Sequence, residues 1–439
     1  MSKIRLHGSS SGYTEIAPVA ASGNNTLTLP DDGTIISKDA AGAVGVTSIK
    51  SSNINVGAAV TITESGIEAS GIGITCASIN GTQIGGRRNI VINGDMRIAQ
   101  RATSSTSSGR NTVDRFGVYF DGTDEAPTQS QADISSGTTP YTLGFRKSIK
   151  VTNGNQTSGA GADDYVWIQG NLEAQDIVNS GWNYLSTSSF ITLSFWVKSS
   201  VAQDFKGYLR TRDGTERQYP FATGSLTADT WTKIVKTIPG NSGLTFDNDA
   251  NQGLQINILP FMGTSYSNNS VTEDAWAAYV SAGRLKDNTS TWYTTNNAEF
   301  EITGVQLEVG SQATPFEHRS FGEELTLCER YFEILKITRY SFNGSNHSSG
   351  SPYVKIYWNT KKRAQPTITI PSVGQGSNEL QFIGGNGSYQ TGGTVQSIVH
   401  IDELAAGIQG SGYTGNSTNA EPVMLYGTGT ALIKIDAEI

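Results

Sequence analysis

The chain of 439 residues contains only two cysteines, Cys76 and Cys328, which are separated by most of its length. Two cysteines this far apart cannot build a disulfide framework or a cysteine-rich metal site. The sequence also lacks an apolar run of about 18 residues, which a membrane-spanning helix needs. Residues 1–20 lack a basic stretch followed by an apolar one, so we expect neither membrane insertion nor a cleaved export signal. The fold must then depend on packing or on oligomerisation.

Charged residues are also scarce, at 16% of the chain, and the formal net charge is -8. Binding to nucleic acid needs clustered Lys and Arg side chains. The compact basic runs here are Arg87-Arg88 and Lys361-Lys362-Arg363, and both are too short for that purpose. We therefore expect no nucleic-acid partner.

What the sequence does contain is glycine, at 50 residues, together with abundant Ser, Thr and Asn. Glycine supplies positive φ angles and asparagine supports local turn hydrogen bonds, so this composition is typical of short strands joined by tight turns. The predicted fold class is all-β. The length predicts more than one domain, because a single core stops growing at about 250 to 300 residues.

The first part of the chain has too few large apolar residues for a core of its own. Residues 1–45 contain a short alternating start and a strand-then-turn pattern that ends at Gly33. Residues 46–86 have isolated Ile and Val residues among small polar ones and no aromatic residue. Such a pattern can line the axis where several identical chains meet, so it predicts an intertwined β shaft; the alternative is a disordered linker.

A globular domain is predicted from residue 89 to residue 320, where aromatic residues appear and apolar runs lengthen. Apolar side chains at odd positions of 191–198 predict a central strand with one face in the core. The number and spacing of the predicted strands indicate a two-sheet β-sandwich. They lie at 89–92, 113–120, 145–151, 165–169, 190–198, 205–212, 231–237, 254–261 and 299–306.

Three helical segments are predicted between and after these strands. Residues 172–178 and 272–282 read as short helices in long connections between strands, and the second begins with the polar sequence Thr272-Glu273-Asp274. Residues 321–333 have apolar side chains at helical spacing and read as a helical connector. Residues 334–439 return to β character and predict a smaller C-terminal β domain.

Several separated motifs between residues 89 and 333 resemble, in this order, the jelly-roll, carbohydrate-binding-module-like domain of bacteriophage tail fibres. They are Asn89-Ile90-Val91-Ile92-Asn93-Gly94-Asp95-Met96-Arg97-Ile98-Ala99-Gln100-Arg101, Val113-Asp114-Arg115-Phe116, Ser194-Phe195-Trp196-Val197-Lys198, Ile302-Thr303-Gly304-Val305-Gln306-Leu307-Glu308-Val309-Gly310, Ala313-Thr314-Pro315-Phe316-Glu317-His318-Arg319 and Glu323-Glu324-Leu325-Thr326-Leu327-Cys328-Glu329-Arg330-Tyr331. The start of the chain, from Ser2 to Ile16, resembles structural proteins from phages of aquatic bacteria, including cyanobacteria. The stretch from Val60 to Ile67 is similar to fibre segments of such phages, which are usually homotrimers.

The resemblance implies a homotrimeric fibre of the virion, made in the host cytoplasm. Residues 1–45 would attach to tail, baseplate or adaptor proteins, 46–86 would form the shaft, and 334–439 would form a distal tip. The implied function is non-enzymatic adhesion to host cell-surface polysaccharide. Two alternatives stay open: a purely structural baseplate, collar or tail component, and a glycan depolymerase.

We assign no catalytic residue, cofactor or metal from the sequence. Glu323 and Glu324 are adjacent and would point about 100° apart on a helix, so they cannot share a substrate; we expect a solvated face or a pair with Arg330. The four histidines are isolated and form no metal or triad motif. Related sugar-binding jelly rolls often hold calcium through an acid after the Asn-Gly-Asp turn, a position occupied here by Met96-Arg97. Asp95 and Glu299 are the remaining candidates for calcium.

Candidate receptor-binding residues are single aromatic or histidine side chains among flexible polar residues, because sugar recognition uses exposed rings and amide or hydroxyl partners. In the C-terminal domain they are Tyr340, Phe342, His347, Tyr389 and Tyr413. The competing set in the middle domain is Trp182, Trp276 and Trp292. The alternative roles are trimer packing or an ordinary loop position. Trp196 and Trp231 are expected in the core because they lie in predicted strands.

Overall fold

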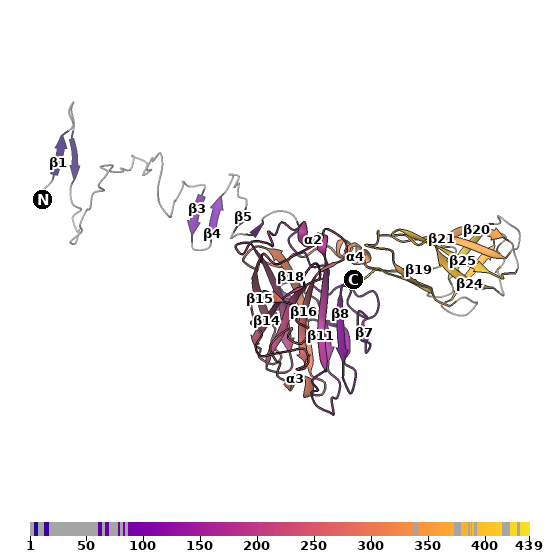
Figure 1. Cartoon of the computed structure of the whole chain (residues 1–439). Helices are drawn as coiled ribbons and strands as arrows, with labels where there is room; N and C mark the ends of the chain where they lie inside the picture. Colours follow the sequence, from indigo (N-terminus) through magenta and orange to yellow (C-terminus); the bar gives the residue numbers. More distant parts are fainter. Residues whose placement is uncertain are drawn as a thin grey trace. The chain divides into compact units, whose positions relative to one another are not determined.

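The computed structural model of the chain divides into two units, Met1–Cys76 and Ala77–Ile439 (Figure 1). The first unit contains two antiparallel strand pairs, β1 (Ile4–His7) with β2 (Tyr13–Ile16) and β3 (Val60–Thr63) with β4 (Gly66–Ala69). The rest of the predicted attachment segment and most of the predicted shaft lie outside the described residues. The structure describes 4–7, 13–16, 60–63, 66–69, 78–79, 82–83, 87–337, 341–348, 350–372, 379–384, 387, 389, 393–414, 422–427 and 431–439.

The second unit begins with the hairpin of β5 (Ser78–Ile79) and β6 (Thr82–Gln83), followed by a β-sandwich of two six-stranded sheets. One sheet, here called the β12 sheet, has the order β15 (Thr232–Pro239), β12 (Phe190–Ser199), β18 (Glu299–Val309), β10 (Lys147–Thr152), β9 (Thr128–Asp133) and β7 (Ser104–Ser105). The other, called the β11 sheet, has the order β17 (Ala277–Ala278), β14 (Arg217–Ser225), β13 (Asp204–Thr211), β16 (Gln252–Met262), β11 (Tyr165–Glu173) and β8 (Phe116–Asp121).

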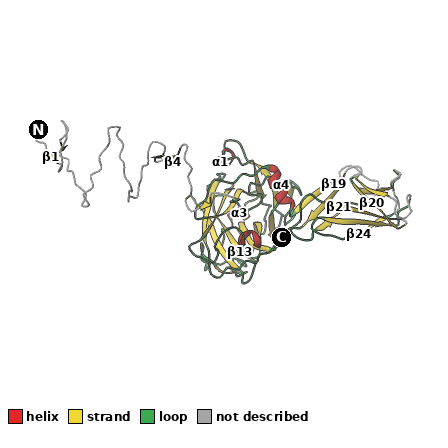
Figure 2. Cartoon of the chain, turned by 90° about the horizontal axis from the view of Figure 1, so that it is seen from above, coloured by secondary structure: helices red, strands yellow, loops and turns green. Residues whose placement is uncertain are grey.

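Helices in the described residues are short, as Figure 2 shows, and the all-β fold class is confirmed. None of the helices in the described part of the chain has the length and apolar character needed to cross a membrane. The helices are α1 (Thr139–Thr142), α2 (Ala174–Val178), α3 (Thr291–Thr294) and α4 (Phe321–Glu329).

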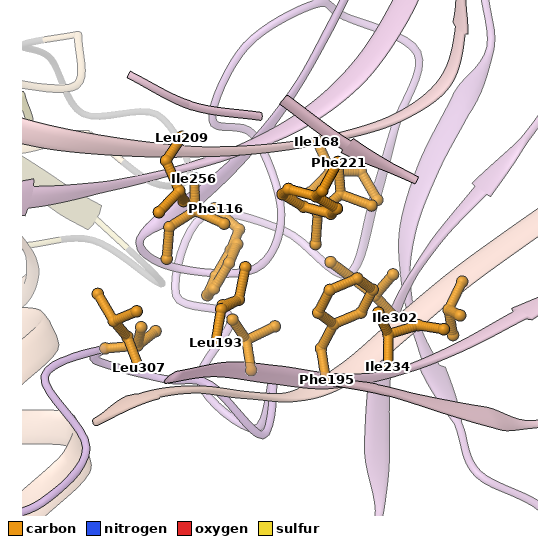
Figure 3. Close-up of a cluster of buried hydrophobic side chains, with 14 of the residues drawn as sticks. Phe116, Ile168, Leu193, Phe195, Leu209, Phe221, Ile234, Ile256, Ile302 and Leu307 are labelled. Atoms are coloured by element: carbon orange, nitrogen blue, oxygen red, sulfur yellow. The ribbon is translucent and has the colours of Figure 1, made fainter. Parts of the chain in front are cut away.

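The core of the sandwich lies between the two sheets (Figure 3). The alternation predicted for β12 is confirmed, because the side chains at positions 191, 193, 195 and 197 are all fully buried. Phe195 faces Phe221 of the β11 sheet with ring centroids 6.4 Å apart. Burial of each large apolar side chain contributes about 1.5–3 kcal/mol to stability. The shared core therefore holds the two sheets together and fixes where their outer faces lie.

Two of the predicted elements are wrong, and a third begins later than predicted. Residues 89–92 form no strand, although Ile90 N–H donates to the carbonyl of Leu307 in β18 at 2.9 Å. Residues 272–282 are not helical, because Asp274 has a φ of +56° and part of this segment pairs with β14 as strand β17. The helix predicted at 172–178 begins only at Ala174, since the two residues before it still pair with β16.

The C-terminal β domain contains a three-stranded and a six-stranded sheet. The first has the order β19 (Phe332–Ile337), β27 (Ala431–Asp436) and β22 (Thr367–Thr369). The second has the order β23 (Leu380–Gly384), β26 (Pro422–Gly427), β20 (Phe342–Ser348), β21 (Ser351–Tyr357), β25 (Ala405–Ser411) and β24 (Thr394–Val399). The domain has its own hydrophobic cluster, which includes Val354, Ile408 and Ile433.

The helix predicted within 321–333 is present as α4, and the Ser320 side chain caps it by accepting from Glu323 N–H at 3.2 Å. The next strand, β19, pairs antiparallel with β27, so the start of β19 and the end of β27 lie at the same end of the C-terminal domain. Arg330 pairs with Glu173 of β11 at 2.8 Å.

Further buried polar contacts hold the C-terminal residues against the sandwich. Arg115 pairs with Glu438, and Gln100 Nε2 donates to the Phe332 carbonyl at 2.7 Å. Burial alone would raise the pKa of Glu438, but the nearby arginines outweigh it and leave that pKa lowered. The carboxylate therefore stays charged, and the two domains are joined by hydrogen-bonded ion pairs as well as by the chain.

Candidate functional site

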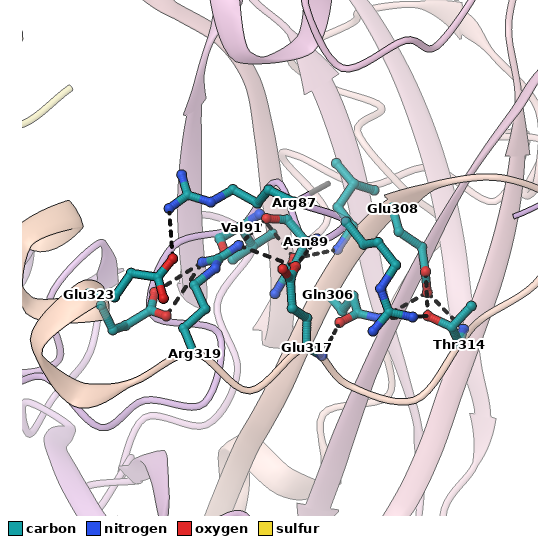
Figure 4. A network of polar contacts seen from close by, with 12 residues as sticks. Arg87, Asn89, Val91, Gln306, Glu308, Thr314, Glu317, Arg319 and Glu323 are labelled. Atoms are coloured by element: carbon teal, nitrogen blue, oxygen red, sulfur yellow. Dashed lines mark hydrogen bonds and ion pairs between the residues drawn. The ribbon is translucent and has the colours of Figure 1, made fainter. Parts of the chain in front are cut away.

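The segments around Asn89, Gln306 and Arg319 form a network of polar contacts beside β18 (Figure 4). The Asn89 side chain donates to the Val305 carbonyl at 3.2 Å and accepts from Val91 and Leu307 N–H at 3.0 and 3.1 Å. Arg319 donates to the Val91 carbonyl at 3.2 Å. These side-chain hydrogen bonds take the place of the backbone ladder that a strand at 89–92 would form. Their role is to hold the start of the sandwich onto β18.

The two adjacent glutamates of α4 have partners other than the expected Arg330. Glu324 is buried and pairs with Arg319 at 3.3 Å, while Glu323 lies 3.6 Å from Arg87. The expected solvated face is therefore confirmed for Glu323, which is exposed, and wrong for Glu324, and the expected pair with Arg330 is wrong for both. Burial raises the pKa of Glu324, because nearby hydrogen bonds and Arg319 only partly offset the loss of water.

Two of the three tryptophans proposed as a platform in the middle domain are core residues. Trp292 is 0% exposed and donates its indole N–H to the Glu299 carbonyl at 3.1 Å. Trp182 is 3% exposed and donates to the Ser189 carbonyl at 3.3 Å. This corrects their assignment as receptor-binding residues, since neither ring has a surface that a sugar could reach. Trp276 is half-buried, and its indole N–H donates to the Pro239 carbonyl at 2.7 Å.

The candidates in the C-terminal domain also have different environments. Tyr413 is 5% exposed and packs edge-on against Phe382 at 5.3 Å, so it is corrected from a surface residue to a core residue. Phe342 is half-buried against the same core. His347 is exposed on β20, and Tyr389 is 47% exposed with its ring 5.8 Å from that of Tyr426. Tyr340 lies outside the described residues.

Trp196 and Trp231 were expected in the core, and both are half-buried instead. Trp196 lies in β12 between the core residues Phe195 and Val197, so its side chain points to the opposite, outer face of the β12 sheet. The indole of Trp231 lies beside Lys198, whose ammonium is 5.4 Å from its ring centroid.

The outer face of the β11 sheet carries a row of aromatic rings. Val166 and Ile168 point into the core, so the alternating Tyr165 and Trp167 point outward, and both are half-buried. Their rings stack with centroids 4.4 Å apart. Tyr119 of β8, the register partner of Trp167, extends the row at 6.0 Å.

Tyr266, in the segment that follows β16, closes the row at its other end. Its ring meets Tyr165 edge-on at 5.7 Å. The Arg284 guanidinium carbon lies 4.7 Å from the centroid of Tyr266 and 5.6 Å from that of Trp167. A cation at this distance is attracted by the ring faces and helps to fix their orientation.

Side-chain amides lie directly beside these rings. Gln169 and Asn257 are register partners on β11 and β16, and Gln169 Nε2 donates to Asn257 Oδ1 at 3.1 Å. Asn257 Nδ2 in turn donates to the Tyr208 carbonyl at 3.4 Å. Asn257 is 0% exposed and serves to hold Gln169, which is half-buried. We call Tyr119, Tyr165, Trp167, Tyr266 and Gln169 the amide–ring face.

A glycine beside the row makes room for Tyr119. A Cβ added to Gly117 would lie 2.8 Å from the Tyr119 ring and 2.9 Å from Cγ of Arg110.

Burial, followed by the charge of Asp121, raises the pKa of Tyr165. Its phenol therefore stays protonated at neutral pH and offers an O–H donor beside an apolar ring face.

Two glutamates at or beside the ends of strands of the β11 sheet are held by other protein groups. Glu173, at the end of β11, accepts from Arg330 and from the Tyr331 hydroxyl at 2.6 Å. Glu216 pairs with Arg212 at 2.6 Å. The face itself offers ring stacking and hydrogen bonds from the Gln169 amide and the Tyr165 hydroxyl, with the Arg284 guanidinium lying against the rings.

The two calcium candidates also have basic partners. Asp95 pairs with Arg97 at 2.5 Å, and Glu299 pairs with Lys150 at 2.8 Å. Within the described ranges, no three His, Cys, Asp or Glu side chains come together as a metal-binding group would.

The sequence contains a signal for the amide–ring face that our interpretation did not use. The strand Tyr165-Val166-Trp167-Ile168-Gln169-Gly170-Asn171 alternates aromatic or amide residues with small and apolar ones. In a strand with one buried face, this alternation directs the rings and amides outward together. Which neighbouring strands supply their partners follows only from the sheet order.

Three solved structures are similar to this chain at low identity. The N-terminal cellulose-binding domain of a β-1,4-glucanase C from Cellulomonas fimi is 11% identical with a TM-score of 0.24, over 49% of this chain and 99% of that chain. A family 11 carbohydrate-binding module from Clostridium thermocellum, solved with a β-1,3-1,4-mixed-linked tetrasaccharide, is 13% identical with a TM-score of 0.22, over 46% and 91%. The CBM22-1 and GH10 modules of an endo-1,4-β-D-xylanase 10B from Clostridium thermocellum, complexed with xylohexaose, are 11% identical with a TM-score of 0.24, over 53% of this chain.

The present chain spans 29% of the length of that xylanase structure. No family model matches the chain, and no curated protein matches its sequence.

Proposed function

We propose that this protein is a non-catalytic glycan-binding adhesin of a bacteriophage tail fibre, and that its amide–ring face contacts the host surface polysaccharide. The observation that carries the proposal is the row of half-buried rings beside the half-buried amide of Gln169 on one rigid sheet. The C–H face of a sugar packs on an aromatic ring, while its hydroxyls exchange hydrogen bonds with amides and phenols. A face already ordered by the core loses little entropy on binding.

The fibre context rests on the motif order between residues 89 and 333 and on the similarity of the N-terminal segments to phage structural proteins. In this proposal the chain is a homotrimer in the virion, attached through residues 1–45 to tail, baseplate or adaptor proteins. Three copies of one weak site on a common axis would raise the overall affinity without any new contact.

A non-catalytic role is supported by the state of the nearby carboxylates. Cleavage of a glycosidic bond generally uses two carboxyl groups on either side of it. Glu173, at the end of β11, and Glu216, next to the start of β14, are both held by arginines. Such groups are poorly placed to transfer a proton or attack a sugar.

The proposal is tested by binding of the full chain to envelope polysaccharide extracted from candidate host cells. Point substitutions suit this test, because a truncation after residue 333 would also remove Glu438, the buried partner of Arg115. We expect Trp167→Ala to weaken binding by about tenfold or more, which corresponds to about 1.4 kcal/mol. The matched control is Trp231→Ala, which removes a half-buried tryptophan that lies outside the amide–ring face.

Equal losses in the two variants, or no loss in Trp167→Ala, would contradict the assignment of this face. If the folded wild-type protein binds no host polysaccharide, the structural tail component becomes the better explanation. Release of reducing ends from the polysaccharide would instead support the depolymerase.

A further inference from the structure

The outer face of the opposite β12 sheet contains a cleft that has no part in the function proposed above. Its volume is about 380 Å³, which is near the lower end of the range for small-molecule sites. The floor contains Trp196 of β12 and Gly304 of β18, and Phe316 and His318 line one wall.

A local irregularity of the sheet opens this cleft. The pairing of β12 with β18 shifts register between Ser194 and Trp196, and Gly304, opposite this shift, has a φ of +63°. A Cβ at Gly304 would lie 2.7 Å from the Phe145 ring and 3.2 Å from Cδ1 of Trp196. Only glycine therefore allows the two rings to approach the backbone here.

The aromatic wall is rigid because its rings pack on one another. The Phe316 ring meets Phe145 at 4.9 Å and His318 at 4.9 Å, both edge-on. The His318 ring nitrogen Nε2 lies 2.9 Å from the Leu143 carbonyl oxygen, which ties this wall to the loop after α1. The cleft is thus present before any ligand binds.

Its charge distinguishes this cleft from the rest of the sheet. The ionisable side chains that line it are Lys233 and His318, and no carboxylate lines it. Lys233 is exposed and has no ion pair within the described part of the chain. On the same sheet, Lys198 pairs with Glu301 at 2.8 Å, and Lys236 pairs with Asp274 at 3.2 Å. In a chain of net charge -8, an unneutralised ammonium beside aromatic rings favours an anionic ligand.

We propose that this cleft is a second saccharide site, which binds a sugar unit carrying a carboxylate, such as a hexuronate. The sugar ring packs against Trp196 and Phe316, and its carboxylate pairs with the Lys233 ammonium. This arrangement combines apolar contact with a charge-assisted hydrogen bond. The inference goes beyond the proposed function and does not depend on the amide–ring face.

The test compares trigalacturonate with its carboxyl-reduced, neutral counterpart by titration calorimetry against the full chain. It is run in the wild type and in Trp167→Ala, so that binding at the amide–ring face is measured separately. We expect the acidic trisaccharide to bind about tenfold more tightly than the neutral one. Lys233→Gln should abolish this difference, and Lys233→Arg should keep it. Lys236→Gln, which removes a neighbouring cation outside the cleft, should leave it unchanged.

Equal affinity for the two trisaccharides, or no measurable binding of either, would overturn the proposal. So would a preference that survives Lys233→Gln or is lost in Lys236→Gln. A preference that disappears only in Trp167→Ala would place acid recognition on the amide–ring face and would also overturn it. Failure of the amide–ring proposal, in contrast, leaves the Lys233 comparison unaffected.

Discussion

The two outer faces of the sandwich share one core but differ in the chemistry they offer. The amide–ring face presents stacked rings and the neutral amide of Gln169, and the Arg284 guanidinium beside them lies against the rings of Tyr266 and Trp167. The β12 sheet presents a ring-lined cleft with Lys233, which has no ion pair among the described residues, whereas Lys198 and Lys236 pair with carboxylates. The first face suits neutral hydroxyls and the second suits an anionic group, so one sandwich can recognise two features of a mixed glycan.

The difference shows how little of the surface chemistry depends on the core. In both sheets alternate side chains point inward and are apolar, as Ile168 in β11 and Phe195 in β12 illustrate. The outward positions are free of this packing constraint and so carry the distinct chemistry of each face. Three changes, taken from the largest expected effect to the smallest, test this separation.

Phe195→Ala removes a fully buried ring that supports both faces. We expect it to lower the free energy of unfolding by about 3–5 kcal/mol, because the lost apolar contact is accompanied by a cavity. Chemical denaturation measures this loss, and both faces should lose binding together. The control is Val235→Ala at a position that is 44% exposed, where we expect a change of at most about 0.5 kcal/mol. Similar losses in the two variants would mean that the faces do not share this support.

Asp176→Asn should change the stability of the protein without changing saccharide binding, because Asp176 lies in α2 beyond the end of β11. Burial, followed by the charge of Glu173, raises the pKa of Asp176 to about 6 from its ordinary value of 3.8. Because the pKa is raised only in the folded state, ionisation of Asp176 lowers the free energy of unfolding. This loss of stability is absent below about pH 4, grows as the pH rises, and is complete above about pH 6. At pH 7 the substitution should stabilise the protein by about 1–2 kcal/mol, after allowance for partial exposure.

Thermal denaturation of both proteins at pH 4 and pH 7 measures this effect. The stabilisation should vanish at pH 4, and the ratio of the two saccharide affinities should not change at either pH. Stabilisation of the same size at both pH values would show that the ionised carboxylate is not its cause.

Added salt should give the smallest effect and acts on one face only. Raising the ionic strength from about 0.05 M to about 0.5 M shortens the screening length several-fold. We expect binding of trigalacturonate at the cleft to weaken by about threefold to tenfold, since an exposed ion pair contributes about 0.2–1 kcal/mol and long-range attraction adds to it. Binding of a neutral glycan to the amide–ring face should change by less than about twofold. Calorimetry at the two salt concentrations gives both values, and equal salt dependence would remove the contrast between the faces.

Much of the fold could be predicted from local pattern, and the failures have identifiable causes. The central strand β12 and helix α4 were predicted because alternation and helical spacing are properties of short segments. Strand β14 was missed, since its Pro220 and Gly224 argue against a strand. Residues 272–282 look helical locally, but pairing with β14 overrides that preference.

The candidate site could be predicted only in part. An aromatic residue in a loop and one in a strand look alike in sequence when their neighbours are polar. Trp292 therefore resembled a surface residue, although α3 directs it into the core. Trp196 resembled a core residue because it lies in a strand. It alternates with the buried Phe195 and Val197, so its side chain points to the outer face of the sheet.

The sequence by itself determined the all-β class, the alternation of the main strands and the outward rings and amides of 165–171. It determined these because composition, turn residues and period-two patterning act over a few neighbouring positions. The tertiary structure alone decided that Tyr119 meets Trp167, that Gln169 meets Asn257 and that Lys233 lies beside Trp196. These pairs come from strands distant in sequence, so their contact depends on sheet order and register, which local pattern does not contain.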